Sequence, residues 1–401
     1  MKTLRFQSFV LVSLSFILGF SEFIIVGIIN DVAQQFSVSV AAVGLLVTLF
    51  AAVYAIATPL ISLLIGKHRL YWSLVLLVTI FIAGNLLTAL AGNYIVLAIS
   101  RMLTAVVSGA IVSLAITFGS FLAPMEKRAG LIAWIFSGFS IAAVFGVPVG
   151  TWISSYTSWR NVFWLISLLG VVTLILAMKC LPAGLRQQQT RNFFSQLAIF
   201  GDRRIRLGVL LPMFNLAGIY VFYTYLQPLF AQALNFHSNT IAVLLFGYGF
   251  MSLLGNLYSG RMADENGLSK LTVVFLLQTI LLVTLPVVLG SRWSAVPVIM
   301  FLGLTMYLVN SPTQLFFLEV AEKNFPQSMV LASSFNSIFA NLGIAIGSAV
   351  GSLLYLHTGL VGIGPGGAFF AALALLVNLT LTRLRQSSAG YKKFSSKNKK
   401  V

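Results

Sequence analysis

Charged side chains are scarce in this chain: they make up 8% of its 401 residues, and only 8 residues are acidic. Hydrophobic residues make up 59% of the chain, and its mean hydropathy is +0.98. A soluble globular domain usually has about a quarter of its residues charged, because its surface faces water. The shortage of charge therefore excludes a soluble fold and predicts a protein embedded in a membrane.

Side chains that bind metals or act as nucleophiles are also few. The single cysteine, Cys180, can form no disulfide within the chain, and His68, His237 and His357 each fall in or beside a short loop. No metal-site spacing is present, no nucleophile stands with a base and an orienting group, and the phosphate-binding pattern GxxxxGK(S/T) is missing. We therefore expect no metal, no cofactor, no enzyme activity and no ATP-driven pump.

The chain does contain a series of long hydrophobic runs, rich in Leu, Ile, Ala and Gly. A helix needs about 20 residues to cross a bilayer, whereas the strands of a membrane barrel show about ten residues of alternating polarity. Twelve runs are long enough, near 6–29, 40–65, 70–91, 94–122, 129–155, 160–181, 207–233, 240–260, 271–290, 295–320, 328–355 and 362–384. The sequence thus predicts an all-α integral membrane protein with twelve transmembrane helices.

The net charge of +17 is unevenly placed along the chain. Basic residues gather in every second loop and in the tail; only Arg160 and Arg292 fall in the other loops, and Arg101 lies within the fourth run. Because basic loops stay on the cytoplasmic side of a membrane, we expect both termini in the cytoplasm and no nucleic-acid partner. The tail "KKFSSKNKK" either contacts anionic lipid or is solvated.

The longest polar connection divides the runs into six and six. We expect an N-terminal six-helix bundle at 1–182, a cytoplasmic linker at 183–206, a C-terminal six-helix bundle at 207–385 and a basic cytoplasmic tail at 386–401. Two segments, 137–155 and 334–352, lie within the fifth run of each half and align at an offset of 197 residues. This alignment pairs Gly146 with Gly343 and Gly150 with Gly347. This weak repeat predicts two pseudo-symmetric bundles related by an axis along the membrane normal.

The loop after the eighth run, "GRMADENGLSK", carries a regular set of polar residues. Gly260 allows helices to approach closely, and Asp264 is suited to accept bonds from amides at a helix start and to pair with bases such as Arg261 and Lys270. Such contacts can form in one conformation and break in another; an ordinary polar loop is the alternative. The loop resembles a cytoplasmic motif of the major facilitator superfamily, although the equivalent loop of the first half has no acid.

The fifth run, "GFSIAAVFGVPVGTWISS", has glycines and a proline within an apolar helix. Gly146 and Gly150 permit close packing, and Pro148 removes a backbone donor, so the segment is either a hinge or a rigid packing face. It resembles the antiporter signature of the superfamily. Together with "SEFIIVG", "SWRNVF" and "YTYLQP", it makes nearly the whole chain similar to the drug/proton antiporter branch, which includes bacterial exporters of sugars, purines and chloramphenicol. The resemblance implies proton-driven export from a bacterial plasma (inner) membrane.

Two opposite charges lie inside the runs at matching depth. Glu22 and Arg101 are each eight residues from the outer ends of the first and fourth runs. Arg101 matches the fourth-helix arginine of the superfamily, although Ala105 stands where that motif commonly has glycine. Both helices line the central cavity of the resembled fold, so we expect the two residues to pair there and to couple proton binding to opening. The alternatives are a structural bond from Glu22 to a neighbouring helix and an Arg101 that extends towards the interface.

Polar and aromatic residues in the later runs are candidates for a substrate cavity. They are Tyr223, Tyr225, Gln227, Asn310 and Asn336. Aromatic rings stack on flat apolar solutes, and amides give directional hydrogen bonds. Tyrosines also gather at membrane interfaces and asparagines also join helices, which is the alternative for each of them.

The sequence therefore favours a secondary active transporter that exports a small organic solute, such as a drug, a sugar or a nucleobase-like compound, by proton antiport through alternating access. The alternatives are a proton-coupled uptake symporter or facilitator, and a membrane sensor that keeps the carrier fold without transporting. The expected partners are the solute, protons and membrane lipids, and the expected state is a monomer.

Overall fold

The structure, a computed structural model, describes residues 2–65, 69–185, 197–264, 267–325 and 328–397. The first half of the chain forms α1 (Lys2–Phe36), α2 (Val40–Ile65), α3 (Leu70–Ala89), α4 (Tyr94–Leu122), α5 (Met125–Ile141), η1 (Ala142–Gly146), α6 (Val147–Tyr156) and α7 (Trp159–Cys180). The second half forms η2 (Leu197–Gly201), α9 (Arg203–Gly208), α10 (Leu210–Tyr223), α11 (Leu226–Pro228), η3 (Leu229–Ala233), α12 (Ser238–Asp264), α13 (Gly267–Val288), α14 (Arg292–Met306), α15 (Asn310–Asn324), α16 (Met329–Thr358), η5 (Gly359–Val361) and α17 (Ile363–Lys397).

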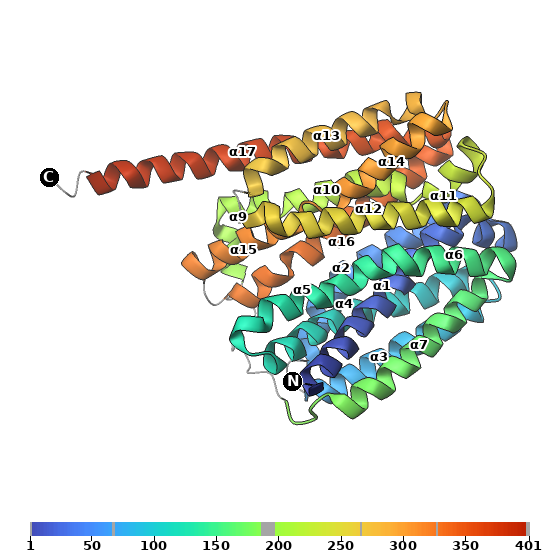
Figure 1. Cartoon of the computed structure of the whole chain (residues 1–401), viewed down its shortest axis with the longest axis horizontal. Coiled ribbons are helices and arrows are strands. Elements are labelled where there is room, and N and C mark those ends of the chain that lie inside the picture. The colour runs from blue at the N-terminus through green and yellow to red at the C-terminus, as the bar shows by residue number, and fades with distance from the viewer. Residues whose placement is uncertain (1, 66–68, 186–196, 265–266, 326–327, 398–401) are drawn as a thin grey trace.

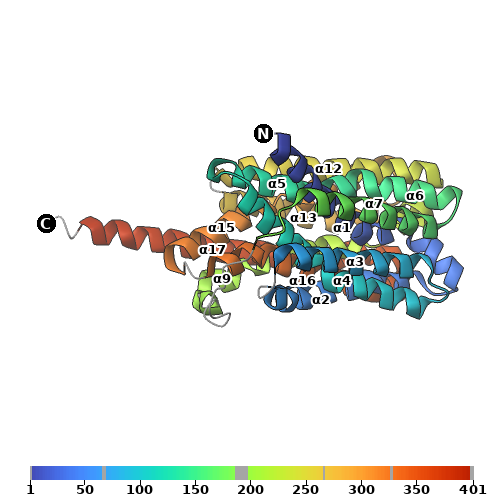
Figure 2. The same ribbon diagram turned by 90° about the horizontal axis from the view of Figure 1, so that it is seen from below.

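Twelve helical segments in the described part of the chain are long and apolar enough to cross a membrane, as the sequence predicted. Figure 1 shows the first half, from blue to green, lying below the second half, from yellow-green to red. Figures 1 and 2 place both chain termini at the same end of the bundle. We call this the termini end and the opposite one the distal end.

Two expected spans contain breaks, and each break precedes a proline. The seventh span, expected to be continuous over 207–233, ends as a helix at Tyr223 and resumes as the short α11 and the π-helical η3. The tenth, expected over 295–320, is interrupted between Met306 and Asn310. Pro228 and Pro312 have no amide hydrogen to donate to the carbonyl four residues earlier, so the regular ladder cannot continue there.

The fifth span is irregular for the same reason. A π-helical turn, η1, separates α5 from α6, and the amide of Val147 donates to the carbonyl of Ala142, five residues back. Pro148 follows directly and has no amide hydrogen for the carbonyl of Val144. The segment that the sequence singled out therefore has a specific backbone distortion.

The first helix is longer than the hydrophobic run that predicted it. The run ends at residue 29, but α1 continues to Phe36 through Asn30 and Asp31. The amide of Asn30 donates to the side-chain oxygen of Gln227 at 3.1 Å, and the hydroxyl of Ser154 donates to the carboxylate of Asp31. Other helices thus supply partners for the main chain at Asn30 and for the carboxylate of Asp31, whereas Oδ1 of Asn30 is buried without a partner among the described residues.

The two halves repeat one packing arrangement. A methyl group added at Gly146 in the first half would lie 2.9 Å from the ring of Phe20 on α1, and one at Gly347 in the second half would collide with the carbonyl of Ala217 on α10. In each half the first spanning helix thus packs on the glycines of the fifth. Both halves meet where α2 packs on α16 and where α12 packs on η1 and α6.

The expected segment boundaries are only partly covered by the structure. Residues 186–196 of the linker lie outside the described residues, and its last part forms η2 and the start of α9. The expected tail begins inside α17, which runs past residue 385 and projects beyond the bundle in Figure 2.

Candidate transport site

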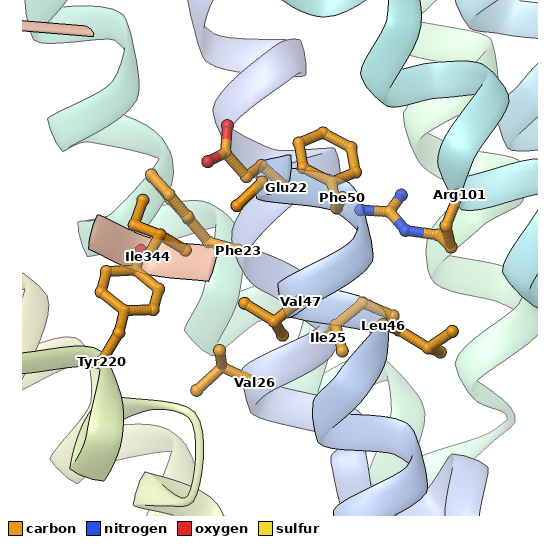
Figure 3. Close-up of a pocket in the computed structure, with 11 residues that line it drawn as sticks. Glu22, Phe23, Ile25, Val26, Leu46, Val47, Phe50, Arg101, Tyr220 and Ile344 are labelled. Atoms are coloured by element: carbon orange, nitrogen blue, oxygen red, sulfur yellow. The ribbon is translucent and has the colours of Figure 1, made fainter. Parts of the chain in front are cut away.

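A small cavity lies between the two halves. Three polar side chains line it, Glu22 of α1, Arg101 of α4 and Tyr220 of α10, and Figure 3 shows their placement. The other lining residues are apolar, and they are Phe23, Ile25, Val26, Leu46, Val47, Phe50, Ala51 and Ile344. Its size is close to the minimum that admits one water molecule. In this conformation the cavity is therefore too small for an organic solute.

Arg101 is buried and held by α1. Its side chain is 1% exposed, Nη1 donates to the hydroxyl of Ser21 at 2.9 Å, and Nη2 donates to the carbonyl of Ser21 at 2.7 Å. The guanidinium carbon lies 4.8 Å from the centre of the Phe50 ring and 5.6 Å from that of Phe163. Arg101 therefore does not extend to the interface, which excludes that alternative for this conformation.

Glu22 and Arg101 line one cavity but form no ion pair, although both side chains are among those described. Figure 3 shows the Glu22 carboxylate pointing away from the guanidinium, and in that view the Phe50 ring lies between them. The expected direct pair is therefore wrong for this conformation. The reason is local: Ser21, the residue before Glu22, offers Arg101 two oxygen acceptors on the side of α1 that faces α4.

Ser21 is itself fixed by the third helix. Its hydroxyl donates to Oδ1 of Asn85 at 2.7 Å, and Nδ2 of Asn85 donates to the carbonyl of Phe81 at 2.9 Å. Ser21 and Asn85 are each 0% exposed. A buried network with its donors and acceptors matched in this way has one favoured arrangement.

Several tyrosines lie near the cavity, and Tyr220 lines it. Tyr220, Tyr223 and Tyr307 lie within electrostatic range of Glu22, as does Tyr54 of α2. The rings of Tyr220 and Tyr223 are 5.1 Å apart in an edge-to-face arrangement, and Tyr223 stacks on Tyr248 at 5.2 Å. Tyr223, one of the expected substrate residues, is thus within electrostatic range of Glu22 but is not among the residues that line the cavity.

Two other expected cavity residues lie elsewhere. Tyr225 donates to the hydroxyl of Ser352 at 2.7 Å and stacks on Tyr355 at 4.7 Å between centroids, while Gln227 accepts from the amide of Asn30. The break after Tyr223 places both residues at helix contacts near the distal end. The expectation that they line the cavity is therefore wrong for this conformation.

Asn310 and Asn336 form a chain of side-chain amides apart from the cavity. Nδ2 of Asn310 donates to Oδ1 of Asn256 at 3.3 Å, and Nδ2 of Asn336 donates to Oδ1 of Asn310 at 3.4 Å. Asn336 also accepts from Thr313, and Asn256 donates to Ser140 of the first half at 3.5 Å. The amides join helices to one another and reach across the boundary between the halves.

Gly146 and Gly150 of the fifth span lie against α1. Gly146, Pro148 and Gly150 are buried, and a methyl group at Gly150 would collide with Ile24. The close packing expected of these glycines is therefore confirmed. Movement at the adjacent π-helical turn stays a prediction.

The loop motif is only partly described. An added methyl group at Gly260 would meet no atom within 4 Å, so the expected close helix approach at this residue is wrong. The close approach occurs instead at Gly267, where a methyl group would lie 2.9 Å from Pro312 and 3.0 Å from the carbonyl of Met262. Arg261 is exposed at the end of α12, Lys270 lies in the first turn of α13, and the side chain of Asp264 lies outside the described ones.

Sequence reasoning missed the residues that hold Arg101 in place. Ser21 and Asn85 carry a signal in retrospect, because Ser21 adjoins Glu22 and Asn85 is an amide inside a hydrophobic run. Phe50 carries no such signal, since it is one of 33 phenylalanines. Only the arrangement of the helices identifies it as a neighbour of Arg101.

The sequence has recognisable relatives. The Major Facilitator Superfamily profile matches residues 11–330. YtbD of Bacillus subtilis, described as an uncharacterised MFS-type transporter, is 30% identical over 347 residues, which are 86% of this chain and 88% of the relative. The inner membrane transport protein YdhP of Escherichia coli is 29% identical over 371 residues, with 90% of this chain and 92% of YdhP covered.

A solved structure shares the fold. A bacterial homologue of the human lysosomal transporter Spinster, in an inward-facing and unoccupied conformation, matches with a TM-score of 0.65 at 16% identity over 94% of this chain and 95% of the homologue. Family and fold point to a transporter rather than an enzyme, and the twelve apolar helices and bacterial relatives to a multi-pass protein of the bacterial inner membrane. With the family profile matched over most of its length, this chain belongs to the major facilitator superfamily.

Proposed function

We propose that the protein is a secondary active transporter of the drug/proton antiporter branch, which exports a small organic solute in exchange for protons. The observation that carries this proposal is the cavity between the halves, where the carboxylate of Glu22 has no hydrogen-bond partner among the described residues and a buried guanidinium lies nearby. An ionisable group in apolar surroundings is costly, and a proton-binding role accounts for its presence.

Competition between proton and solute at Glu22 would produce antiport. An ionised Glu22 balances the charge of Arg101 and can accept hydrogen bonds from a solute, whereas a protonated Glu22 leaves the cavity with one net positive charge. If the solute binds better to the ionised form, each ligand lowers the affinity for the other by the same factor. Export then follows when protons enter from outside and release the solute there.

Contacts between the halves support an alternating-access cycle. Gln227 bonds to Asn30, Ser348 accepts from Thr48 at 3.1 Å, and Asn239 of α12 donates to Tyr156 of α6 at 3.1 Å. These contacts join the distal ends of the helices, so we infer that the distal side is closed in this conformation. From the basic loops we infer that the termini end faces the cytoplasm.

Two further elements are proposed to take part in the conformational change. The π-helical turn before Pro148, between Gly146 and Gly150, would act as a hinge in the fifth span, because its backbone bonds are already irregular. The loop from Gly260 to Lys270, with Arg261 and Asp264, would act as a latch at the termini end. Its acid-dependent contacts would form in one state and break in the other.

The substrate is proposed to be a small organic solute with an apolar face and some hydrogen-bonding groups, such as a drug, a sugar or a nucleobase-like compound. Tyr223 and its stacked neighbours offer aromatic faces near Glu22. Asn310 and Asn336 are hydrogen-bonded to other helices in this conformation. They would become accessible to the solute only if the two halves move apart at the termini end and these bonds break.

Everted membrane vesicles with an imposed pH gradient provide the test. Sugars, nucleobases and lipophilic antibiotics would be screened for uptake into vesicles that contain the wild type or Glu22→Gln. We expect the variant to lose gradient-driven uptake at least about tenfold while keeping part of its solute exchange, because it still forms the cavity but cannot exchange a proton. Glu319→Gln, an acid near the termini end of α15, is the matched control and should transport normally.

Each other result selects an alternative. Equal coupled transport by wild type and Glu22→Gln would remove Glu22 from the proton path. Solute movement in the same direction as protons would identify an uptake symporter, and movement independent of the gradient would identify a facilitator. No flux of any solute in the panel would favour the sensor.

A further inference from the structure

Arg101 has more contacts than a cation in a cavity requires. Two of its nitrogens donate to Ser21, one to the main chain and one to the hydroxyl, and its guanidinium faces two aromatic rings. Its third nitrogen, Nε, is buried without a partner among the described residues. The side chain is thus fixed on α1, with one donor left unpaired.

Asn85 determines which way the Ser21 hydroxyl points. Because Nδ2 of Asn85 already donates to the carbonyl of Phe81, its Oδ1 is the atom that faces Ser21 and can only accept. Ser21 must therefore give its single hydrogen to Asn85, and its oxygen is left as an acceptor for Arg101. A hydroxyl free to rotate would not present this acceptor permanently.

Phe50 controls the opposite side of the guanidinium. Its ring centre lies 4.8 Å from the guanidinium carbon, and in Figure 3 the ring lies between Arg101 and Glu22. An aromatic face attracts a cation, most strongly where water is excluded. The ring thus both binds Arg101 and occupies part of the space that a direct ion pair would need.

We propose that Asn85 and Phe50 are positioning residues, which hold Arg101 on the main chain of α1 and away from Glu22. The proposal rests on the proton-coupling role of Glu22 proposed above. With Arg101 held in this way, Glu22 is available to a proton or a solute in the conformation described. Releasing Arg101 would let the guanidinium pair with Glu22 and compete with both.

Few other charges act on Glu22. Among the described residues, the ionisable groups that interact electrostatically with Glu22 are Arg101 of α4, Tyr54 of α2, and Tyr220, Tyr223 and Tyr307 of the second half. The helices α5, α6 and α7, which also pack against α1, bring no ionisable side chain to Glu22 within the described ranges. Arg101 is therefore the cation whose position sets the proton affinity of Glu22.

Infrared difference spectroscopy of the purified protein in lipid, recorded over a pH series, tests this without knowledge of the solute. The C=O stretch of a protonated carboxyl that disappears in Glu22→Gln reports the protonation of Glu22. In Asn85→Leu and Phe50→Leu we expect the midpoint of this signal to fall by about one pH unit, since a paired guanidinium stabilises the ionised carboxylate. Ser21→Ala should show a shift of the same sign, because it removes the hydroxyl that accepts a hydrogen bond from Nη1 of Arg101.

Two variants serve as controls. Ser21→Thr keeps the hydroxyl and should keep the wild-type midpoint. Thr88→Val changes a buried residue on the same helix as Asn85, bonded to Ser100 at 2.8 Å rather than to Ser21, and should also leave the midpoint unchanged. A shift in Thr88→Val as large as that in Asn85→Leu would overturn the proposal, because any disturbance of α3 would then have the same effect.

The two proposals fail in different ways. If wild type shows the Glu22 signal but Asn85→Leu, Phe50→Leu and Ser21→Ala share its midpoint, only the positioning proposal is overturned. If wild type shows no signal that Glu22→Gln removes, the proton-coupling role of Glu22 is wrong, and the positioning role has nothing to act on.

Discussion

The two halves of the molecule share their packing but differ in chemistry. In each half the first spanning helix lies against glycines of the fifth, through Gly146 and Phe20 in one and Gly347 and Ala217 in the other. The offset of 197 residues places Ile219 and Val298 where the first half has Glu22 and Arg101. The repeated feature is therefore the helix contact, whereas the two charges that line the cavity both belong to the first half.

The halves also differ in backbone regularity. In the first half α1 and α4, which carry the charges, are continuous helices. In the second half the first and fourth spans break after Tyr223 and after Met306. A rigid helix keeps a charge in a fixed place, whereas a break allows a side chain to move with little cost in backbone bonds. The two charges that line the cavity thus lie on regular helices, and these two breaks lie in the other half.

The largest expected effect is on transport, and it concerns Arg101, which has no charged counterpart in the second half. Arg101→Lys should lower gradient-driven transport at least about tenfold, because an ammonium cannot give Ser21 two bonds from one planar group while facing Phe50. The assay is the vesicle measurement described above. Arg160→Lys is the control, since Arg160 donates to the carbonyl of Ala91 away from the cavity. Unchanged transport in Arg101→Lys would show that any cation is sufficient there.

A smaller effect is expected from the glycine contacts that the halves share. In Gly347→Ala the new methyl group would collide with the main-chain carbonyl of Ala217, and in Gly150→Ala it would meet the end of the Ile24 side chain. A side chain can change rotamer but a helix backbone cannot move alone, so we expect costs of about 3 and about 1 kcal/mol. Thermal unfolding midpoints in one detergent measure this, with Gly260→Ala as an unaffected control. Equal losses would mean that both halves repack equally well.

The smallest expected effect is on stability, and it comes from a difference between the first helices of the two halves. The first turn of α1 contains no acid, whereas Asp202 caps α9 and bonds to Arg204 at 2.6 Å. Burial raises the pKa of the Asp202 carboxyl, but hydrogen bonds from Arg204 and Ile205 together outweigh it and hold the pKa below its ordinary value. This stabilisation is complete above the unfolded pKa of about 4 and is lost as the pH falls through the lower folded value.

Asp202→Asn tests this difference, because asparagine keeps the cap but has no charge. We expect its unfolding midpoint at neutral pH to lie slightly below that of wild type, by an amount worth less than about 1 kcal/mol, since the pair is partly exposed. The gap should narrow below about pH 4. A gap that is constant with pH would show that the charge of Asp202 adds nothing.

Much of the fold followed from the hydrophobic runs, but their interruptions did not. Twelve spans are predictable because each must bury its backbone polar groups within a helix to enter a bilayer. Pro148 marked an irregular fifth span, but the breaks beside Pro228 and Pro312 were not expected, and Pro59, Pro286 and Pro297 lie inside continuous helices. Whether a proline breaks a helix depends on which donors the neighbouring helices offer to the freed carbonyls. Beside the break in the tenth span, Nδ2 of Asn215 on α10 donates to the carbonyl of Met306 at 2.9 Å, so another helix supplies the donor there.

The candidate site was predictable in its charges and not in their partners. Glu22 and Arg101 were identifiable because ionisable residues are rare inside hydrophobic runs. Their pairing was expected because they lie at equal depth in the membrane. In the structure, Arg101 instead donates hydrogen bonds to Ser21. Depth along the membrane normal is a one-dimensional quantity, and rotation of each helix about its axis decides which neighbour a side chain meets.

The sequence by itself determined the membrane, the number of crossings, the repeat of two halves and the two buried charges, because hydrophobic length and charge placement are local properties of the chain. Only the tertiary structure decided that Asn85 and Phe50 act on Arg101, that Gly267 rather than Gly260 is the close contact, and that Tyr225 and Gln227 lie outside the cavity. These depend on helix rotation and on which helices are neighbours, and both are set by packing between segments far apart in the chain.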